Sequence, residues 1–106
     1  MGFRKAEFFV AQVNGNYKKV SGWTDESGTY GFHALRRVAK KTGNKRVVKW
    51  IVSDIASGLM IAEGRTRDEC LNWVVIHQKE IDKQKKKKEY KTYVERLDNV
   101  GGQHDE

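Results

Sequence analysis

Apolar positions follow two different patterns along this chain. Between residues 7 and 64 they form short runs bounded by glycine-containing turns, which is typical of strands in an antiparallel sheet. From residue 66 onward they recur every three or four positions, which is typical of an amphipathic helix. We therefore expect one α+β domain over residues 1–106, with a sheet of four to five antiparallel strands, including two hairpins, packed on a long C-terminal helix.

The helix predicted over residues 66–100 carries signals at both ends. Thr66 and Glu69 form a capping box, in which the hydroxyl accepts a bond from the amide three residues on and the carboxylate reaches back to the Thr66 amide. No proline follows, and Gly101-Gly102 favour a stop. We expect residues 101–106 to form a mobile tail.

Two apolar stripes on this helix point in different directions. The first comprises Leu71, Val74, Val75 and Ile81, and the second, the C-terminal stripe, comprises Tyr90, Tyr93, Val94 and Leu97. At about 100° per residue, the second stripe is centred roughly 90° around the helix from the first. A straight helix cannot lay both stripes on one small sheet, so we expect a bend, a break or a projecting arm near residues 83–89.

Two hairpins are predicted from their turns. Asn14-Gly15 separates the runs 8–13 and 17–20, and a two-residue loop there places Phe9 and Val20 on the better core face. The second hairpin joins 47–52 to 59–62 around Gly58, whose lack of a Cβ suits a left-handed turn. The predicted core comprises Phe9, Val20, Ile51, Leu59, Ile61, Leu71, Val74 and Val75.

Residues 30–42 fit two structures. Phe32, Leu35 and Val38 recur at helical spacing, which favours a short helix that ends at Thr42-Gly43-Asn44. The same segment could instead pair with residues 45–52 as a hairpin. If Ile51 faces the core, Trp50 lies on the opposite face of the sheet, where the 30–41 segment would cover it.

Composition narrows the classes of function. The formal net charge is +7 and the pI is about 9.6, which favours polyanionic partners. The single cysteine excludes an internal disulfide framework and fits a reducing cytoplasm. The N-terminus lacks the apolar segment of a signal peptide, and no apolar run is long enough to span a bilayer.

Candidate catalytic and metal-binding chemistry is sparse. The three histidines are scattered, and Cys70 and His77 lie about 10 Å apart along one helix, too far to share a zinc ion. No phosphate-binding loop or dinucleotide fingerprint is present. We expect no enzyme, no cofactor, no metal site and no small-molecule substrate.

Two regions are rich in cations. The first set has few acids near it and is brought together whether residues 30–42 form a helix or a strand: Arg36, Arg37, Lys40, Lys41, Lys45, Arg46 and Lys49. The second region surrounds the expected bend: Lys83, Lys85, Lys86, Lys87, Lys88 and Lys91. Four consecutive lysines there go right round a helix, so no single face is cationic, which is typical of a solvated segment.

The unit from Trp50 to Cys70, a hairpin followed by a capped helix, resembles the last two strands and closing helix of a double-stranded-RNA-binding domain. It is also similar to the same unit in HicB-type antitoxins. In the RNA-binding domains the helix starts with phosphate-gripping lysines, whereas Asp68 and Glu69 occupy that first turn here. The resemblance therefore transfers no site residues.

These patterns favour a cytoplasmic accessory protein that binds DNA or RNA, gripping the phosphate backbone through the first cation set. The alternative is a protein-binding adaptor or inhibitor. It would cover the C-terminal stripe with a protein partner or a second copy, because association is one way to bury an apolar stripe.

Overall fold

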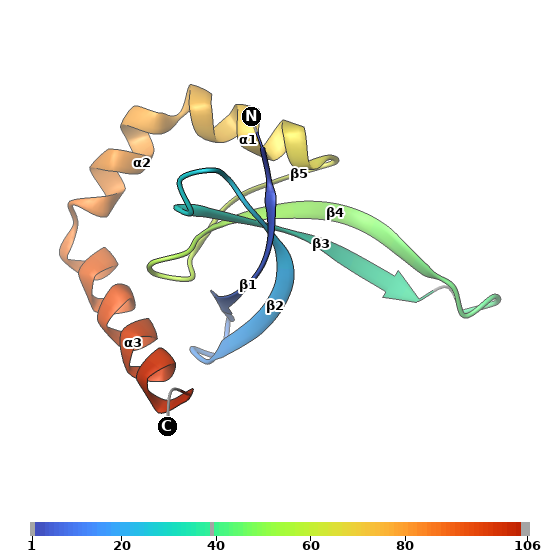
Figure 1. The fold of residues 1–106 in the computed structure, drawn as a ribbon, viewed down its shortest axis with the longest axis horizontal. Helices are drawn as coiled ribbons and strands as arrows, with labels where there is room; N and C mark the ends of the chain where they lie inside the picture. Colours follow the sequence, from blue (N-terminus) through green and yellow to red (C-terminus); the bar gives the residue numbers. More distant parts are fainter. Residues whose placement is uncertain (1, 39, 105–106) are drawn as a thin grey trace.

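The computed structural model describes residues 2–38 and 40–104 and contains a curled five-stranded antiparallel sheet followed by three helices, which confirms the α+β class (Figure 1). The strands lie in chain order across the sheet. Their bounds are β1 Arg4–Ala11, β2 Tyr17–Thr24, β3 Tyr30–Val38, β4 Lys45–Asp54 and β5 Met60–Gly64. The helices are α1 Arg67–Ile76, α2 Gln78–Lys85 and α3 Lys88–His104, and they form an arc around one end of the sheet.

Residues 30–38 form a strand, so the expectation of a helix there is wrong. β3 pairs with β4 along its whole length, from Tyr30 opposite Asp54 to Val38 opposite Lys45. The helix-forming side chains at 34–36 are overridden because the neighbouring strand supplies a ladder of hydrogen bonds and cross-strand contacts. The segment lies beside β4 and does not cover it.

The turn of the first hairpin is one residue longer than predicted. Ala11 pairs with Tyr17, and Phe8 pairs with Val20. The loop therefore has three residues between Gln12 and Asn16, with Gly15 at a φ of +85°. Since side chains alternate between faces, this shift exchanges the faces of one strand relative to the other. The core face of β1 therefore carries Phe8, which is 5% exposed, and the prediction that Phe9 lies on the core face is wrong.

The main core lies between α1 and the middle of the sheet. Its buried apolar members are Tyr30, Phe32, Val52, Cys70, Val74 and Ile81. On β4 the core face carries Val52 and Trp50, so the assignment of Ile51 to that face is wrong. Val74 is buried as predicted, but Val75 is 64% exposed because only one side of α1 meets the sheet.

The sheet curls strongly where β2 crosses β3. These strands pair at two positions only, Trp23 with Phe32 and Thr24 with Gly31. A Cβ on Gly22 would lie 2.2 Å from the carbonyl oxygen of Phe32, and one on Gly31 would lie within 3 Å of the Phe8 ring. Glycine at these positions therefore permits the close crossing that brings Phe8 over β3.

The C-terminal third begins as predicted and then breaks twice. The Thr66 hydroxyl accepts a hydrogen bond from the amide of Glu69 at 3.0 Å, but the Glu69 carboxylate bonds the amide of Arg65, one residue before the expected one. His77 separates α1 from α2, and Lys86-Lys87 separate α2 from α3, inside the range 83–89. Gly101-Gly102 do not stop the helix, since α3 extends to His104. Of the predicted tail, residues 105–106 lie outside the described residues.

Candidate functional site

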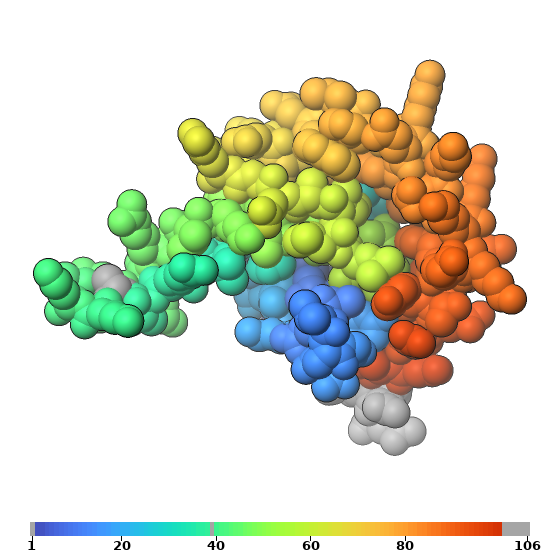
Figure 2. Space-filling model, turned by 180° about the vertical axis from the view of Figure 1, so that it is seen from behind, coloured from blue at the N-terminus to red at the C-terminus, as the bar shows by residue number. Residues whose placement is uncertain are grey.

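The far end of the β3–β4 hairpin projects from the body of the protein as a two-stranded ribbon (Figures 1 and 2). We call residues 36–48 the basic arm. All of its described residues are exposed, whereas β3 and β4 are buried at their other ends, around Phe32 and Val52. The arm exists because the two strands continue to pair after the sheet's other strands have ended. At its base, Arg36 lies beside Glu7 and Trp23 of the first hairpin, with which it lines a hollow.

The arm holds the cations that sequence analysis grouped together. Arg36 and Arg37 come from β3, Lys45 and Arg46 from β4, and Lys40 and Lys41 from the connecting turn. The seventh predicted cation, Lys49, lies at the base of the arm and forms an ion pair with Glu63 at 2.6 Å. Six of the seven residues are therefore brought together on one exposed projection.

The charge of the protein is unevenly distributed. Of its 21 Lys and Arg residues, seven belong to the predicted set, and the other 14 equal the Asp and Glu residues in number. No acidic residue occurs between Tyr30 and Ser53. Among the described residues, no ion pair involves the six cations of the arm. The net charge of +7 is therefore concentrated in this hairpin, and the body is close to neutral.

Both faces of the arm carry positive charge. Directly opposed residues share a face, and the pairs are Arg36 with Val47, Arg37 with Arg46, and Val38 with Lys45. A shift in register between Leu35 and Arg36 leaves one extra residue on β4. Arg37 and Arg46 face each other, and such like-charge pairs destabilise a ribbon until an anion lies between them or beside them.

Three apolar side chains are exposed among these cations. Val38, Val47 and Val48 have exposed fractions of 59%, 42% and 46%. With Arg37 and Arg46 they line a shallow hollow of about 380 Å³. The surface of the arm is thus cationic with apolar patches, and it contains no aromatic residue.

The second basic region has one paired member and five exposed ones. Lys85 turns inward, with its ammonium nitrogen 3.3 Å from Asp54 Oδ1 and 5.1 Å from the centre of the Tyr30 ring. The other members, Lys83, Lys86, Lys87, Lys88 and Lys91, are exposed on two helices and the turn between them.

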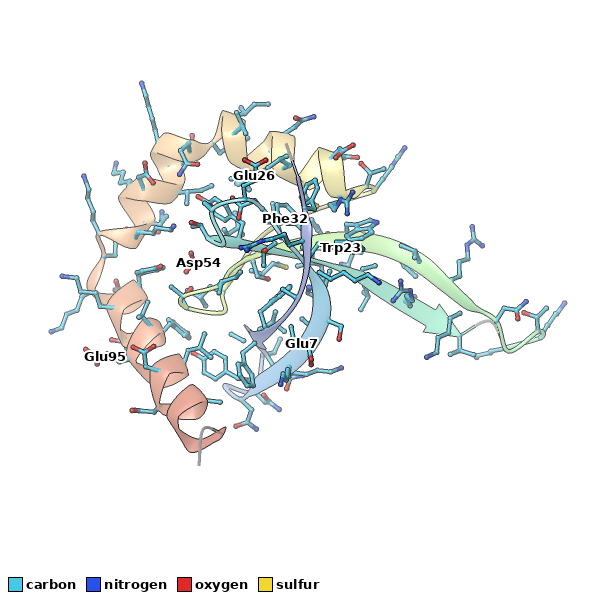
Figure 3. All side chains as sticks on the ribbon, in the orientation of Figure 1. Glu7, Trp23, Glu26, Phe32, Asp54 and Glu95 are labelled. Atoms are coloured by element: carbon cyan, nitrogen blue, oxygen red, sulfur yellow. The ribbon has the colours of Figure 1, made fainter. Side chains whose placement is uncertain are left out.

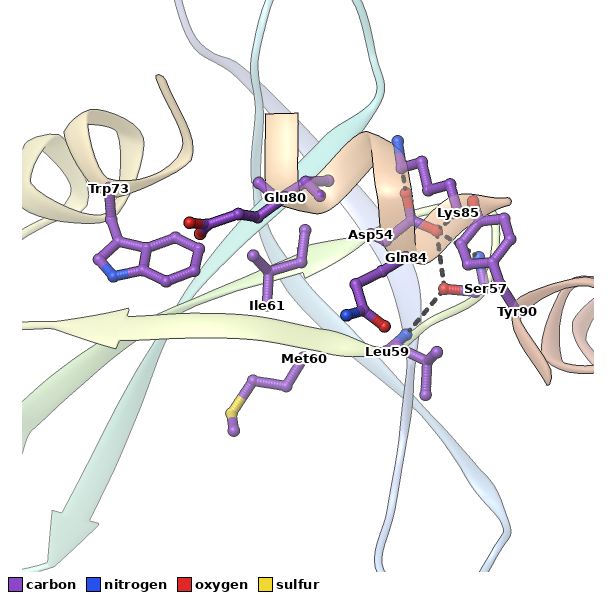
Figure 4. A pocket seen from close by; sticks show the side chains of 11 residues that line it. Asp54, Ser57, Leu59, Met60, Ile61, Trp73, Glu80, Gln84, Lys85 and Tyr90 are labelled. Carbon is purple, nitrogen blue, oxygen red and sulfur yellow. Dashed lines mark hydrogen bonds and ion pairs between the residues drawn. The ribbon is translucent and has the colours of Figure 1, made fainter. Parts of the chain in front are cut away.

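A buried carboxylate at the end of β4 joins three parts of the fold (Figures 3 and 4). Asp54 is 3% exposed, and its Oδ2 accepts hydrogen bonds from the Ser57 amide at 3.0 Å, the Ser57 hydroxyl at 2.7 Å and the Tyr90 hydroxyl at 2.7 Å. Oδ1 pairs with Lys85. Burial and the bond to Asp54 raise the pKa of Tyr90 well above its usual value. We call these four residues the Asp54 cluster.

The Asp54 cluster borders a cleft of about 390 Å³ between α2, β5 and the start of α3. Trp73, Met60 and Ile61 form its apolar side (Figure 4). Oδ2 accepts three hydrogen bonds, whereas Oδ1 is buried with the Lys85 ion pair and no hydrogen-bond partner among the described residues. The sequence analysis missed this cluster, because Lys85 and Tyr90 are more than 30 residues away from Asp54 along the chain.

The C-terminal stripe contacts the chain's own sheet. The Tyr17 hydroxyl donates to the Tyr93 carbonyl oxygen at 3.2 Å, Tyr90 bonds Asp54, and Leu97 is 8% exposed. Tyr93 and Val94 are partly buried. Tyr17 of β2 and Asp54 of β4 thus bond two members of the stripe, and Leu97 is its one buried residue.

The remaining chemistry-bearing residues are dispersed. The Cys70 thiol is fully buried beneath the sheet, donates to the Trp50 carbonyl oxygen at 3.5 Å, and has a pKa raised by burial. His77 stacks on Trp73, with ring centres 3.9 Å apart. Among residues 2–38 and 40–104, no three His, Cys, Asp or Glu side chains gather where they could hold a metal ion.

Two findings concern the chain as a whole. None of the helices in the described part of the chain has the length and apolar character needed to cross a membrane. Comparison with protein-family models, curated proteins and solved structures finds no match.

Proposed function

We propose that this protein binds nucleic acid without catalysing a reaction, and that the basic arm grips the phosphate backbone. The observation that carries the proposal is the concentration of six cations, and no acidic residue, on one exposed projection of a protein whose net charge is +7. We place the protein in the cytoplasm, a proposal supported by its single unpaired and buried cysteine.

Phosphate contacts by lysine and arginine release condensed counterions, which makes binding strong at low salt and weak at high salt. If four to six arm cations each contact one phosphate, the logarithm of the binding constant should fall with the logarithm of salt concentration with a slope of about −4 to −5 on a DNA duplex. Exposed long side chains at the arm can reach phosphates without disturbing the core, because the core lies at the other end of β3 and β4.

The test is a salt titration of binding to a labelled random-sequence duplex, followed by fluorescence anisotropy. Arg37→Gln/Arg46→Gln should weaken binding by about tenfold or more and make the slope shallower by about 2, because two phosphate contacts are lost. The matched control is Lys86→Gln/Lys87→Gln, which removes the same charge from an exposed turn between helices and should change affinity by less than about threefold.

Absence of binding at low salt, or a slope near zero, would contradict the proposal. Equal losses in the two double variants would assign binding to overall charge and not to the arm. Circular dichroism and thermal unfolding of both variants establish that the fold is retained.

The alternative proposal is a protein-binding adaptor or inhibitor that covers the C-terminal stripe. Contacts from Tyr17 and Asp54 within the chain favour it less, because they bond Tyr93 and Tyr90 without a partner. We therefore propose nucleic-acid binding first.

A further inference from the structure

Resting on the proposed function, we infer that the ligand is a B-form DNA duplex and that the basic arm enters its major groove tip first. The proposal on phosphate contacts alone does not distinguish DNA from RNA, duplex from single strand, or groove entry from contact with the outside of a helix. The dimensions, charge pattern and composition of the arm favour duplex DNA and entry into its major groove.

The arm has the dimensions of one groove. Adjacent strands are spaced about 4.8 Å apart, and a ribbon with side chains on both faces is about 10 Å thick. The major groove of B-form DNA is about 12 Å wide and admits a two-stranded ribbon, whereas the minor groove is about 6 Å wide. The major groove of A-form RNA is deep and too narrow for side chains to read. Groove width therefore favours duplex DNA.

The distribution of charge fits insertion between two walls. Arg36 and Lys45 lie on one face of the ribbon, and Arg37 and Arg46 lie on the other. A hairpin that lay against the outside of a helix would need cations on one face only. Between the two phosphate-lined edges of a groove each face meets a wall, and the Arg37–Arg46 repulsion is relieved by phosphate.

Two features of the arm's composition favour duplex DNA over single strands and over duplex RNA. Residues 36–48 contain no Phe, Tyr or Trp, and stacking on such rings supplies much of the affinity for single strands. Val38, Val47 and Val48 are exposed on the arm and have apolar surface to bury. In the major groove, and nowhere else on a duplex, apolar side chains can contact the thymine methyl group.

The test compares three labelled ligands of equal length, each about 20 nucleotides per strand, a size that exceeds one groove contact. They are a mixed-sequence DNA duplex, the RNA duplex of the same sequence, and oligo-dT. The DNA duplex should bind at least about tenfold more tightly than the other two at the same salt concentration, because only its major groove admits the ribbon. Arg37→Gln/Arg46→Gln should reduce this preference, and Lys86→Gln/Lys87→Gln should preserve it.

Groove occupancy is tested on the DNA duplex by competition. Methyl green, which occupies the major groove, should displace the protein, whereas netropsin, which occupies the A·T minor groove, should not. If netropsin displaces the protein and methyl green does not, the assignment of the arm to the major groove is wrong. Equal binding to all three nucleic acids, or tighter binding to RNA, would overturn the inference and leave the proposed function standing. Absence of binding to all three would overturn the proposed function itself.

Discussion

At the end of β4 the carboxylate of Asp54 receives donors from the β4–β5 loop, from α2 and from α3. These contacts compensate for hydration that burial removed, and they join both later helices to the end of β4. The break at Lys86-Lys87 lets α2 present Lys85 and α3 present Tyr90 to the same carboxylate. A continuous helix would turn these two residues to different sides.

Tyr90→Phe should lower the free energy of unfolding by about 1 to 2 kcal/mol, because it removes one donor from a buried carboxylate that keeps its other partners. It should also change the response to alkali. Burial and the bond to Asp54 raise the pKa of Tyr90 in the folded protein above the unfolded value of 10.0. The unfolded chain then ionises first, so this stability is fully present below pH 10 and is lost as the pH rises further.

Urea unfolding of both proteins between neutral and alkaline pH provides the measurement. The wild type should lose stability more steeply than Tyr90→Phe above pH 10. Some loss should remain in the variant, because burial also raises the pKa values of Tyr17 and Cys70. Parallel curves for the two proteins would show that Tyr90 does not carry the effect.

At the level of elements, the curl of the sheet depends on how closely β2 approaches β3. The approach occurs at Gly22, where no side chain separates the strand from the backbone of Phe32. It allows the β1–β2 hairpin to fold over β3, so that the Phe8 ring lies against Gly31 and near the ring of His33. The three-residue turn at residues 13–15 is what directs Phe8 to that side.

Gly22→Ala should destabilise the protein by about 1 to 3 kcal/mol, since the new methyl group meets a main-chain carbonyl and forces the crossing strands apart. Ser21→Ala is the matched control at an exposed position of the same strand, and it should change stability by less than about 0.5 kcal/mol. Thermal or urea unfolding measures both. A Gly22→Ala protein as stable as the control would show that the close crossing is not required.

At the level of the whole molecule, a nearly neutral body carries a cationic projection. The body holds the described buried residues, whereas every described residue of the arm is exposed. Stability and binding are therefore assigned to different parts of the molecule. This division makes the arm removable.

Replacement of residues 37–46 by Asn-Gly should leave the body folded, because Arg36 and Val47 already face each other and can be joined by a two-residue turn. The deletion removes five cations, Arg37, Lys40, Lys41, Lys45 and Arg46. We expect a change in unfolding free energy of less than about 1 kcal/mol, since the arm buries little surface. Binding to duplex DNA should be abolished at near-physiological salt.

Calorimetry and anisotropy on the shortened protein measure the two effects separately. Loss of the cooperative transition would show that the arm supports the body. Retained binding with the transition intact would place the nucleic-acid contact elsewhere.

The sequence by itself determined those elements that depend on interactions between residues close together along the chain. The capped start of α1 follows from Thr66 and its neighbours, and the helical break near the lysines follows from two stripes that no straight rod can align. The cation set could also be read from the chain, because seven residues within fourteen positions stay near each other in any compact fold. Its form as a projecting ribbon could not be read, since the local sequence of residues 30–38 favours a helix and only pairing with β4 makes the segment a strand.

The tertiary structure decided which side of each strand is buried and which distant residues meet. Phe8, and not Phe9, is buried because one additional residue in the turn reverses which side chains of β1 point to the core. Val52, and not Ile51, is buried because α1 packs on that face of β4, and the local sequence does not indicate where α1 lies. The Asp54 cluster joins residues separated by more than 30 positions, and no periodicity encodes that contact. Sequence patterns report on neighbours along the chain, whereas burial and charge pairing depend on neighbours in space.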